Sequence, residues 1–221
     1  MATCHKSYSS RHTSYTVPVV FLLFLTNMYE LIRSNISRFI TLTEDEFSVF
    51  TSSLKHRKLK RKQYLLQAGD ICRYESFVIK GCLRTFSVDD KGQEHVLQFA
   101  IEDWWTGDLH SFFSETASQY NIEALEETEV LQIDNGSLEK LYVAVPKFER
   151  FFRILMQKSL IAFQKRVMNT IKEKAEDRYL EFINKYPQLE QRLPQHQLAS
   201  YLGITPESLS RIRKQLSTKK F

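Results

Sequence analysis

Leucines and isoleucines near the end of the chain follow a helical pattern that a turn interrupts. Between residues 195 and 216 they recur at intervals of three, four and seven on both sides of Gly203, so two short helices share one buried face. Ala199 is small enough for two helices to touch, and Gly203 suits a left-handed turn. Thr205 and Pro206 are typical of the N-cap and the first position of a helix. The pattern predicts a helix-turn-helix whose second helix starts at Thr205.

The second of these helices carries polar and basic side chains on the faces that its buried side does not need. From Thr205 to Phe221 the chain has five basic residues and one acidic residue. A helix that enters the major groove of DNA has this character, and the alternative is a structural hairpin with a solvated basic face. We favour DNA reading because the cap, turn and small-residue positions all agree with it. The predicted DNA-binding residues are Thr205, Glu207, Ser208, Arg211, Arg213 and Lys214.

A long helical pattern precedes this hairpin. After Val145 and Pro146 no glycine or proline occurs until Pro187, which predicts an uninterrupted helical stretch. Apolar residues recur there at spacings of four and three, as in a coiled-coil seam, and a second copy of the same helix is the simplest partner. The alternative is that the stripe is core within one chain. The predicted dimer seam consists of Phe152, Met156, Leu160, Phe163, Val167 and Ile171.

Residues 64–133 alternate short β-favouring runs with turn residues, and most of the six glycines of the chain lie there. Many short strands with glycines at the breaks predict a compact barrel or roll. Residues 89–92, Asp-Asp-Lys-Gly, have the composition of a hairpin turn. The basic run at 55–62 is typical of an edge strand protected by lysines, with a nucleic-acid patch as the alternative.

Composition narrows the class of protein. With 221 residues, 43% hydrophobic and 26% charged, the chain suits a globular protein of two modest domains. Its net charge of +5 permits a polyanionic partner. Its three cysteines lack the number and spacing of a four-thiolate site, so we expect no metal and no cofactor. The six histidines are scattered, and no converging nucleophile and base are found, so we do not expect an enzyme.

The amino end holds an apolar stretch from Val17 to Leu25 that is too short to span a bilayer, which needs about 20 residues. It resembles the apolar region of a signal peptide, but no clear cleavage site follows it. We expect that the natural start is Met28 and that residues 1–27 are a non-native or disordered extension. The protein is then expected to be cytoplasmic, with no membrane partner.

Several short motifs occur in a fixed order along the middle of the chain. They are Ala68-Gly-Asp70, Phe77-Val-Ile-Lys-Gly81, Asp90-Lys-Gly92 and Gly107-Asp-Leu109, followed by a strand, a long helix and the helix-turn-helix. This order resembles the Crp/Fnr family of bacterial transcription regulators, from Met28 onward. The resemblance implies an α+β fold with an N-terminal double-stranded β-roll of the cyclic-nucleotide-binding type, a long dimerisation helix and a C-terminal helix-turn-helix domain with a truncated wing. The expected domains are 28–145 for the roll, 146–173 for the dimerisation helix and 174–221 for DNA binding.

The same resemblance locates an effector pocket. Gly107, Asp108 and Leu109 take the places of Gly, Glu and Leu in the family's phosphate-binding cassette, while Ser118 and Gln119 take the places of its Arg and Ser. A buried cyclic phosphate needs a cation, ideally the fork of an arginine. Between Gly107 and Val130 the chain has no lysine or arginine and several acidic residues. We therefore expect no response to cyclic AMP, and either another small effector or a roll that is purely a scaffold.

In the recognition helix, the resemblance matches Glu207, Ser208 and Arg211 to positions that face bases, with Arg211 suited to a bidentate contact with guanine. Thr205, Arg213, Lys214, Lys219 and Lys220 are expected to contact phosphates. The expected function is that of a homodimeric, sequence-specific DNA-binding transcription regulator, for which RNA polymerase is a further candidate partner. The alternative is a small-effector sensor whose DNA binding is weak or vestigial.

Overall fold

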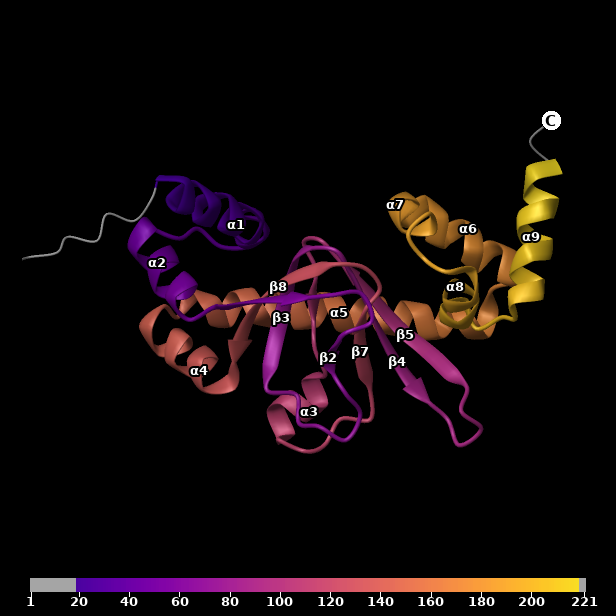
Figure 1. Ribbon diagram of the computed structural model, residues 1–221, viewed down its shortest axis with the longest axis horizontal. Coiled ribbons are helices and arrows are strands. Elements are labelled where there is room, and N and C mark those ends of the chain that lie inside the picture. Colours follow the sequence, from indigo (N-terminus) through magenta and orange to yellow (C-terminus); the bar gives the residue numbers. More distant parts are fainter. Residues whose placement is uncertain (1–18, 219–221) are drawn as a thin grey trace, which may run out of the picture.

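The computed structural model describes residues 19–218, with side chains from Met28 onward (Figure 1). Two helices precede the sheets, α1 (Val19–Ser37) and α2 (Glu44–Ser52). Helix α2 starts with a capping box, because the Thr43 hydroxyl accepts from the backbone N–H of Glu46 and the Glu46 carboxylate accepts from the backbone N–H of Thr43. Of the expected extension at 1–27, residues 1–18 lie outside the described part, and residues 19–27 continue α1.

The middle of the chain is the predicted roll. Two four-stranded antiparallel sheets have the strand orders β1-β8-β3-β6 and β2-β7-β4-β5. The strands are β1 (Lys55–Leu59), β2 (Tyr64–Leu66), β3 (Tyr74–Lys80), β4 (Cys82–Val88), β5 (Glu94–Ile101), β6 (Trp105–Thr106), β7 (Asn121–Ala124) and β8 (Thr128–Asp134), with the short helix α3 (Leu109–Ser114) between β6 and β7.

Two local predictions within the roll are confirmed. The hairpin turn between β4 and β5 closes on Gly92, whose φ is 78°, in the left-handed region that favours glycine. Strand β1 is an edge strand that pairs with β8, and three of its four basic side chains, those of Lys55, His56 and Lys58, reach acidic residues of β8. Lys58 and His56 both reach Glu129, at 3.0 and 2.8 Å. Cross-strand pairing within the roll therefore accounts for these basic residues.

Helix α4 (Asn135–Ala144) was not predicted, although its start has a clear signal. The Asp134 carboxylate accepts from the backbone N–H of Ser137 at 2.9 Å and so caps the helix. After it, α5 (Lys147–Lys172) runs along the molecule behind the roll toward the last helices (Figure 1). Those are α6 (Ala175–Lys185), α7 (Pro187–Glu190), α8 (Gln195–Leu202) and α9 (Pro206–Thr218).

The helical stretch expected up to Pro187 is interrupted, and the break falls next to residue 173, where the dimerisation helix was expected to end. Helix α5 ends at Lys172, and Glu173 and Lys174 adopt extended conformations with ψ of 147° and 155° before α6 begins. Neither residue is a helix breaker, so the sequence carries no local signal for this break. The cause is tertiary: α6 buries Tyr179 and Phe182 among the last helices, a different surface from the one that the start of α5 buries.

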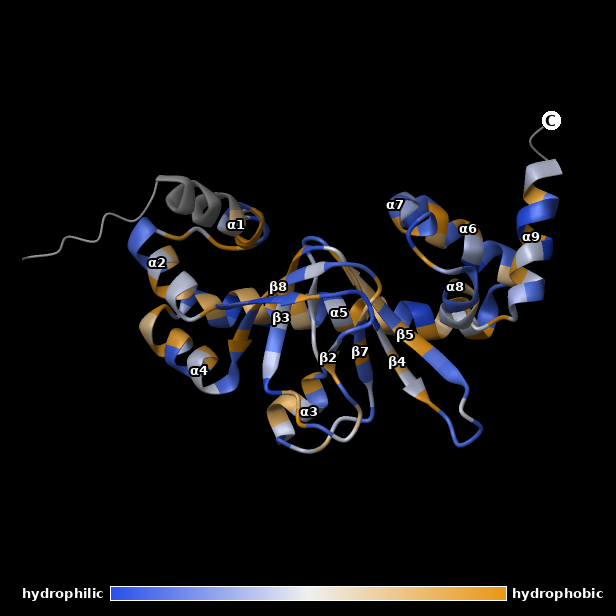
Figure 2. Ribbon diagram, in the orientation of Figure 1, coloured by the Kyte–Doolittle hydropathy of each residue, from blue (hydrophilic) through white to orange (hydrophobic). Residues whose placement is uncertain are grey.

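Buried apolar residues form two clusters. One fills the roll and joins it to α1, α2, α4 and the start of α5. The other joins the outer face of β4 and β5 to α6–α9, so the last helices pack on the roll. Figure 2 shows the tip of the β4–β5 hairpin and much of α9 as hydrophilic. Within the described residues, no helix has both the length and the apolar character needed to cross a bilayer.

We predict that Gly81→Ala destabilises the fold more than Gly69→Ala does. Both glycines have a φ near +100°, namely 99° and 96°, so both substitutions carry backbone strain of about 1–3 kcal/mol. A Cβ on Gly81 would also lie 2.4–2.7 Å from atoms of Thr128 and Glu127, whereas a Cβ on Gly69 would meet nothing within 4 Å. Urea denaturation should show the larger loss for Gly81→Ala, and equal losses would contradict this account.

Candidate nucleic-acid interface

The turn between α8 and α9 has the predicted helix-turn-helix geometry. Gly203 is left-handed, with φ 67° and ψ 37°, and its N–H bonds back to the carbonyls of Ala199 and Ser200. The Thr205 hydroxyl accepts from the backbone N–H of Ser208 at 3.2 Å and so caps α9, as predicted. Helix α9 begins at Pro206, where the missing N–H costs nothing.

The apolar residues that predicted the hairpin form its buried face. Leu198, Ala199 and Leu209 are fully buried, and Leu202 and Ile212 are almost so. Helix α6 supports this face, because Tyr179 and Phe182 belong to the same cluster. Arg178 adds a polar contact, donating from Nε to the carbonyl of Leu202 at 3.1 Å. The support fixes α9 with its opposite side outward, and α9 lies at the end of the molecule away from the roll (Figure 1).

The outward side of α9 borders an open groove of about 670 Å³ between the starts of α8 and α9. Gln195 ties the two starts together by donating from Nε2 to the carbonyl of Pro206 at 3.3 Å. The groove is lined by Gln195, His196, Pro206, Glu207, Ser210, Arg211 and Lys214. It therefore brings together three of the predicted residues, namely Glu207, Arg211 and Lys214, which are spaced at i, i+4 and i+7 along α9.

The sequence reasoning missed Ser210, Gln195 and His196. Ser210 had a signal, because it lies three residues after Glu207 and so shares its helical face. Gln195 and His196 come from α8, and only the crossing of the two helices places them beside Arg211. Ser208 lies outside the groove, half-buried, and its hydroxyl accepts from the Thr205 hydroxyl at 3.2 Å.

Arg213 is a correction to the predicted set of phosphate contacts. Its Nε donates to the Tyr179 hydroxyl at 3.1 Å, and its guanidinium lies 3.4 Å from the Glu190 carboxylate. Helical spacing explains this, since Arg213 follows Leu209 by four residues and faces the supporting helices as Leu209 does. Arg213 therefore braces α9 against α6 and α7 within the carboxy-terminal helices α6–α9, which we call the reading domain. Lys219 and Lys220 lie outside the described residues.

The predicted dimer seam splits into two parts along α5. Phe152 is only 5% exposed and packs against the rings of Trp105 and Tyr142, so it belongs to the core of the protomer and we remove it from the seam. Met156 is half-buried. From there on the apolar residues are open to solvent, with exposed fractions of 57% for Leu160 and Phe163, 40% for Val167 and 73% for Ile171.

Two of the residues expected to form an effector pocket, Asp108 and Ser118, are engaged with each other. Asp108 caps α3 by accepting from the backbone N–H groups of His110 and Ser111. Its other carboxylate oxygen accepts from the Ser118 hydroxyl at 2.7 Å, and both side chains are buried. Gly107 alone of the predicted set lines the nearby cavity of about 490 Å³, so Asp108, Leu109, Ser118 and Gln119 are not its walls.

A buried carboxyl group, Glu75 on β3, lies behind this segment. A Cβ on Gly107 would lie 2.1 Å from Oε1 of Glu75, so only glycine leaves room for it. Burial, and then the charge of Asp108, raise the pKa of Glu75 to about 8. Within the described part of the chain, Oε1 of Glu75 has no hydrogen-bond partner. At neutral pH the carboxyl group of Glu75 is therefore neutral, and the segment from Gly107 to Ser118 itself contains no lysine or arginine.

The buried cysteines carry no reactive chemistry. Burial raises the pKa of Cys72, and it raises the pKa of Cys82 to about 12, so both thiols stay protonated at neutral pH. Both are free thiols inside the fold. No group of metal-ligating side chains was found among residues 28–218.

The amino-acid sequence of this chain is similar to those of known proteins. The cyclic nucleotide-binding domain matches residues 56–144, which cover the roll and α4. The fumarate and nitrate reduction regulatory protein of Vibrio cholerae is 26% identical over 186 residues, which are 78% of this chain and 73% of that protein. The transcriptional activator protein anr of Pseudomonas aeruginosa is 25% identical over 185 residues, which are 78% of this chain and 75% of that protein. In sequence and fold the chain is thus similar to transcription regulators of the Crp/Fnr type.

Solved structures of similar regulators share the fold of this chain. FixK2 from Bradyrhizobium japonicum superimposes with a TM-score of 0.67 at 17% identity, covering 76% of this chain and 86% of that one. The c-di-GMP responsive regulator CLP from Xanthomonas campestris gives 0.65 at 16% identity, covering 80% and 93%. The predicted α+β architecture, a cyclic-nucleotide-binding-like roll followed by a long helix and a helical carboxy-terminal domain, is thereby confirmed.

We predict that Glu75→Gln flattens the dependence of stability on pH in this regulator. The folded pKa of Glu75, about 8, is above its ordinary value of 4.5. The contribution of Glu75 to the stability of the wild type is therefore fully present below pH 4.5 and is lost as the pH rises from 4.5 through 8. The loss is at most about 1.4 kcal/mol per pH unit in that window. Denaturation series from pH 5 to 9 should show the smaller slope for Glu75→Gln, with Glu139→Gln on the exposed face of α4 as the control. Equal slopes would refute the assignment.

Proposed function

We propose that this Crp/Fnr regulator acts as a homodimer that reads a specific DNA sequence with α9. The observation that supports this most is the exposed groove face of α9, where Arg211 and Lys214 point outward while Leu209 and Ile212 hold the opposite face in the core. A protruding helix with a basic outer face and a buried inner face has the form that enters a major groove. Such a function places the protein with the chromosome, in the cytoplasm.

The residues of the groove take different roles in this proposal. Arg211 is exposed in mid-helix and suits a bidentate contact to the O6 and N7 atoms of guanine. Glu207 is exposed one turn earlier, and hydrogen bonds from its own backbone N–H and from Thr205 lower its pKa, so it is ionised and able to accept from a cytosine amino group. Lys214, Gln195 and His196 lie at the groove walls and suit phosphate contacts that position the helix.

Dimer formation follows from the open apolar stripe on the second half of α5. Leu160, Phe163, Val167 and Ile171 repeat at the spacing of a helix seam, and Ile161 and Met168 beside them are 64% and 44% exposed. Uncovered apolar side chains in a row of this length mark an interaction surface. The same stripe on a second copy is complementary to it by symmetry, and it brings two reading domains together for two half-sites.

The roll is proposed to be insensitive to cyclic AMP. In the segment that aligns with the family's cassette, the acidic Asp108 is bonded to Ser118, and Ser118 stands where a cation would pair with the phosphate. An anion there would meet the Asp108 carboxylate, and the aligned segment itself supplies no lysine or arginine to compensate. Gel-shift titrations against promoter DNA with and without cyclic AMP would decide this, and a sharp gain in affinity with the nucleotide would reverse the proposal.

We predict that Arg211→Ala costs about 1–3 kcal/mol of discrimination between a selected DNA site and random DNA, because it removes a base contact. Arg213→Ala is the matched control on the same helix, since it removes an arginine that contacts Tyr179 and Glu190. That control should weaken binding to both DNAs alike. Fluorescence anisotropy with both duplexes at one salt concentration measures the difference, and equal discrimination for wild type and Arg211→Ala would exclude base reading by Arg211.

We predict that Phe163→Glu raises the dissociation constant of the dimer by about a hundredfold or more, since it places a charge in the centre of an apolar seam. Val143→Glu is the control, because Val143 is 86% exposed on α4, outside the stripe. Analytical ultracentrifugation should find monomers for Phe163→Glu at concentrations where wild type and Val143→Glu are dimers. A dimer that survives Phe163→Glu unchanged would mean that another surface joins the copies.

A further inference from the structure

The reading domain is docked on the roll by side chains and backbone together. The backbone N–H of Val96 on β5 donates to the Ser200 hydroxyl of α8 at 3.0 Å, and that hydroxyl donates to the carbonyl of Glu94 at 3.1 Å. The rings of Phe99 and Tyr201 lie 5.3 Å apart. These contacts hold one face of α8 against the β4–β5 hairpin.

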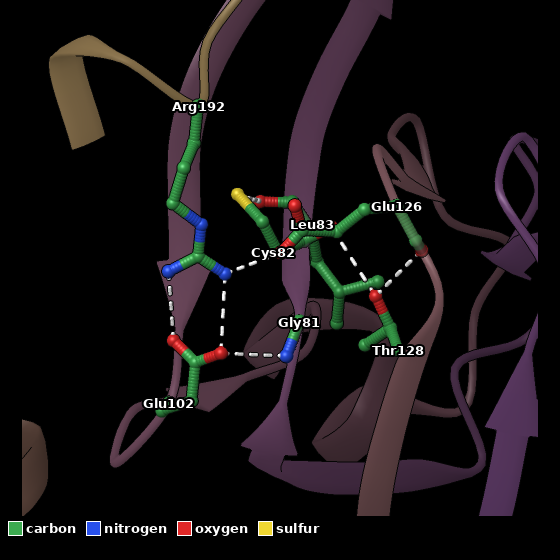
Figure 3. A network of polar contacts seen from close by, with 7 residues as sticks. All are labelled: Gly81, Cys82, Leu83, Glu102, Glu126, Thr128 and Arg192. Atoms are coloured by element: carbon green, nitrogen blue, oxygen red, sulfur yellow. Dashed lines mark hydrogen bonds and ion pairs between the residues drawn. The ribbon is translucent and has the colours of Figure 1, made fainter. Parts of the chain in front are cut away.

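A second contact between the reading domain and the roll is ionic, and Figure 3 shows it. Arg192, in the connection between α7 and α8, contacts two carboxylates of the roll. It is bidentate to Glu102, at 2.9 and 3.1 Å, and it also pairs with Glu126. Glu102 follows β5 and Glu126 precedes β8, so one arginine joins the reading domain to two separate turns of the roll.

The carboxylates are held in place from the side of the roll. Glu102 accepts from the backbone N–H of Gly81 at 2.7 Å, and Gly81 is wedged against Thr128. The Thr128 hydroxyl donates to the carbonyl of Glu126 at 3.0 Å and fixes that turn. Burial alone would raise the pKa of Glu102, but hydrogen bonds from Arg192 and Gly81 lower it overall, so the pair is charged at neutral pH.

The covalent link between α5 and the reading domain does not by itself set the angle between them. Glu173 and Lys174 are extended, and a two-residue non-helical link can bend. Close to this link Glu181 accepts from Lys165 and Asn169 of α5, but contacts near a hinge have a short lever arm. Arg192 lies farther from the link, beyond α6, which has 11 residues and is about 16 Å long. Its contacts therefore control the angle between α5 and the reading domain much more strongly than those of Glu181 do.

We propose that Arg192 is a positioning residue, which fixes the angle of α9 relative to α5 by clamping the reading domain to Glu102 and Glu126. In a dimer joined through α5 this angle sets the distance and the phase between the two recognition helices. The clamp thereby determines which half-site spacing the protein accepts, because one added base pair moves a half-site both along and around the duplex. This proposal rests on the proposed function as a dimeric DNA reader.

The spacing of the half-sites supplies a readout that a merely structural role would not change. Duplexes are built from the half-site that the full-length wild-type protein selects from random DNA, with the spacer shortened or lengthened by one and two base pairs. Wild type should lose about tenfold or more in affinity for each one-base-pair change. Arg192→Ala should flatten this profile to about threefold or less, with unchanged affinity for a duplex that carries a single half-site.

Three further variants separate positioning from stability. Glu102→Gln combined with Glu126→Gln should flatten the profile as Arg192→Ala does, because it removes the same charges from the other side. Arg192→Lys should restore part of the spacing preference, since it keeps the charge and loses the bidentate fork. Arg33→Ala is the control, because Arg33 makes a bidentate pair with Glu44 between α1 and α2 and does not touch the reading domain.

The outcomes are distinct. A flat profile for Arg192→Ala beside a sharp one for Arg33→Ala supports the positioning role. A sharp profile retained by Arg192→Ala overturns it and leaves the proposed DNA-reading function intact. Tighter binding by Arg192→Ala at every spacing also overturns it, since the clamp would then hold the reading domain back. A wild-type protein that binds none of the duplexes overturns both proposals together.

Discussion

The arrangement of this molecule depends on the burial of three phenylalanines at the start of α5. Phe148 and Phe151 are completely buried and Phe152 is 5% exposed, all inside the core that the roll shares with α1, α2 and α4. Phe148 stacks on Phe50 at 4.7 Å, and Phe151 lies 5.9 Å from Phe39. Large aromatic side chains held this closely make the base of α5 a rigid part of the roll and the helices packed on it. The whole of α5 has 26 residues and is about 39 Å long. Its direction is set by the roll, in which its first turns are anchored.

Beyond that anchor, α5 changes role along its length. One side of its second half meets the reading domain, where Arg166 lies over the ring of Tyr201. Another side carries the uncovered seam from Leu160 to Ile171. A single helix therefore joins the roll, the expected second protomer and the reading domain. Because it stops at Lys172, the position of the reading domain also depends on direct contacts with the roll, namely those of Ser200 with β5 and of Arg192 with its two carboxylates.

The segment from Gly107 to Ser118 lies at the position expected for a phosphate-binding cassette but contains no lysine or arginine. Its glycine is required by the close approach of Glu75, and its acidic residue caps α3 and accepts from Ser118. A fully bonded aspartate beside a buried neutral acid favours a rigid connection between the sheets over an anion site. The 490 Å³ cavity next to it is lined mainly by β2, the start of β3 and the connection between them, which carries Arg73, and β1 adds Arg57. An effector of this regulator is thus expected to contact residues outside the aligned segment.

The amino-acid sequence determined those features that local chemistry specifies. Thr205, Gly203 and the leucine spacing fixed the helix-turn-helix, because caps, positive φ and a shared apolar face are set within a few residues. Turn glycines and alternating runs likewise determined the roll. Only the tertiary structure decided the rest. It ended α5 at Lys172 because α6 packs on another surface, withdrew Phe152 into the core and turned Arg213 inward toward Tyr179. It also brought Arg192 to Glu102, 90 residues earlier in the chain, a distance at which no local pattern reports a contact.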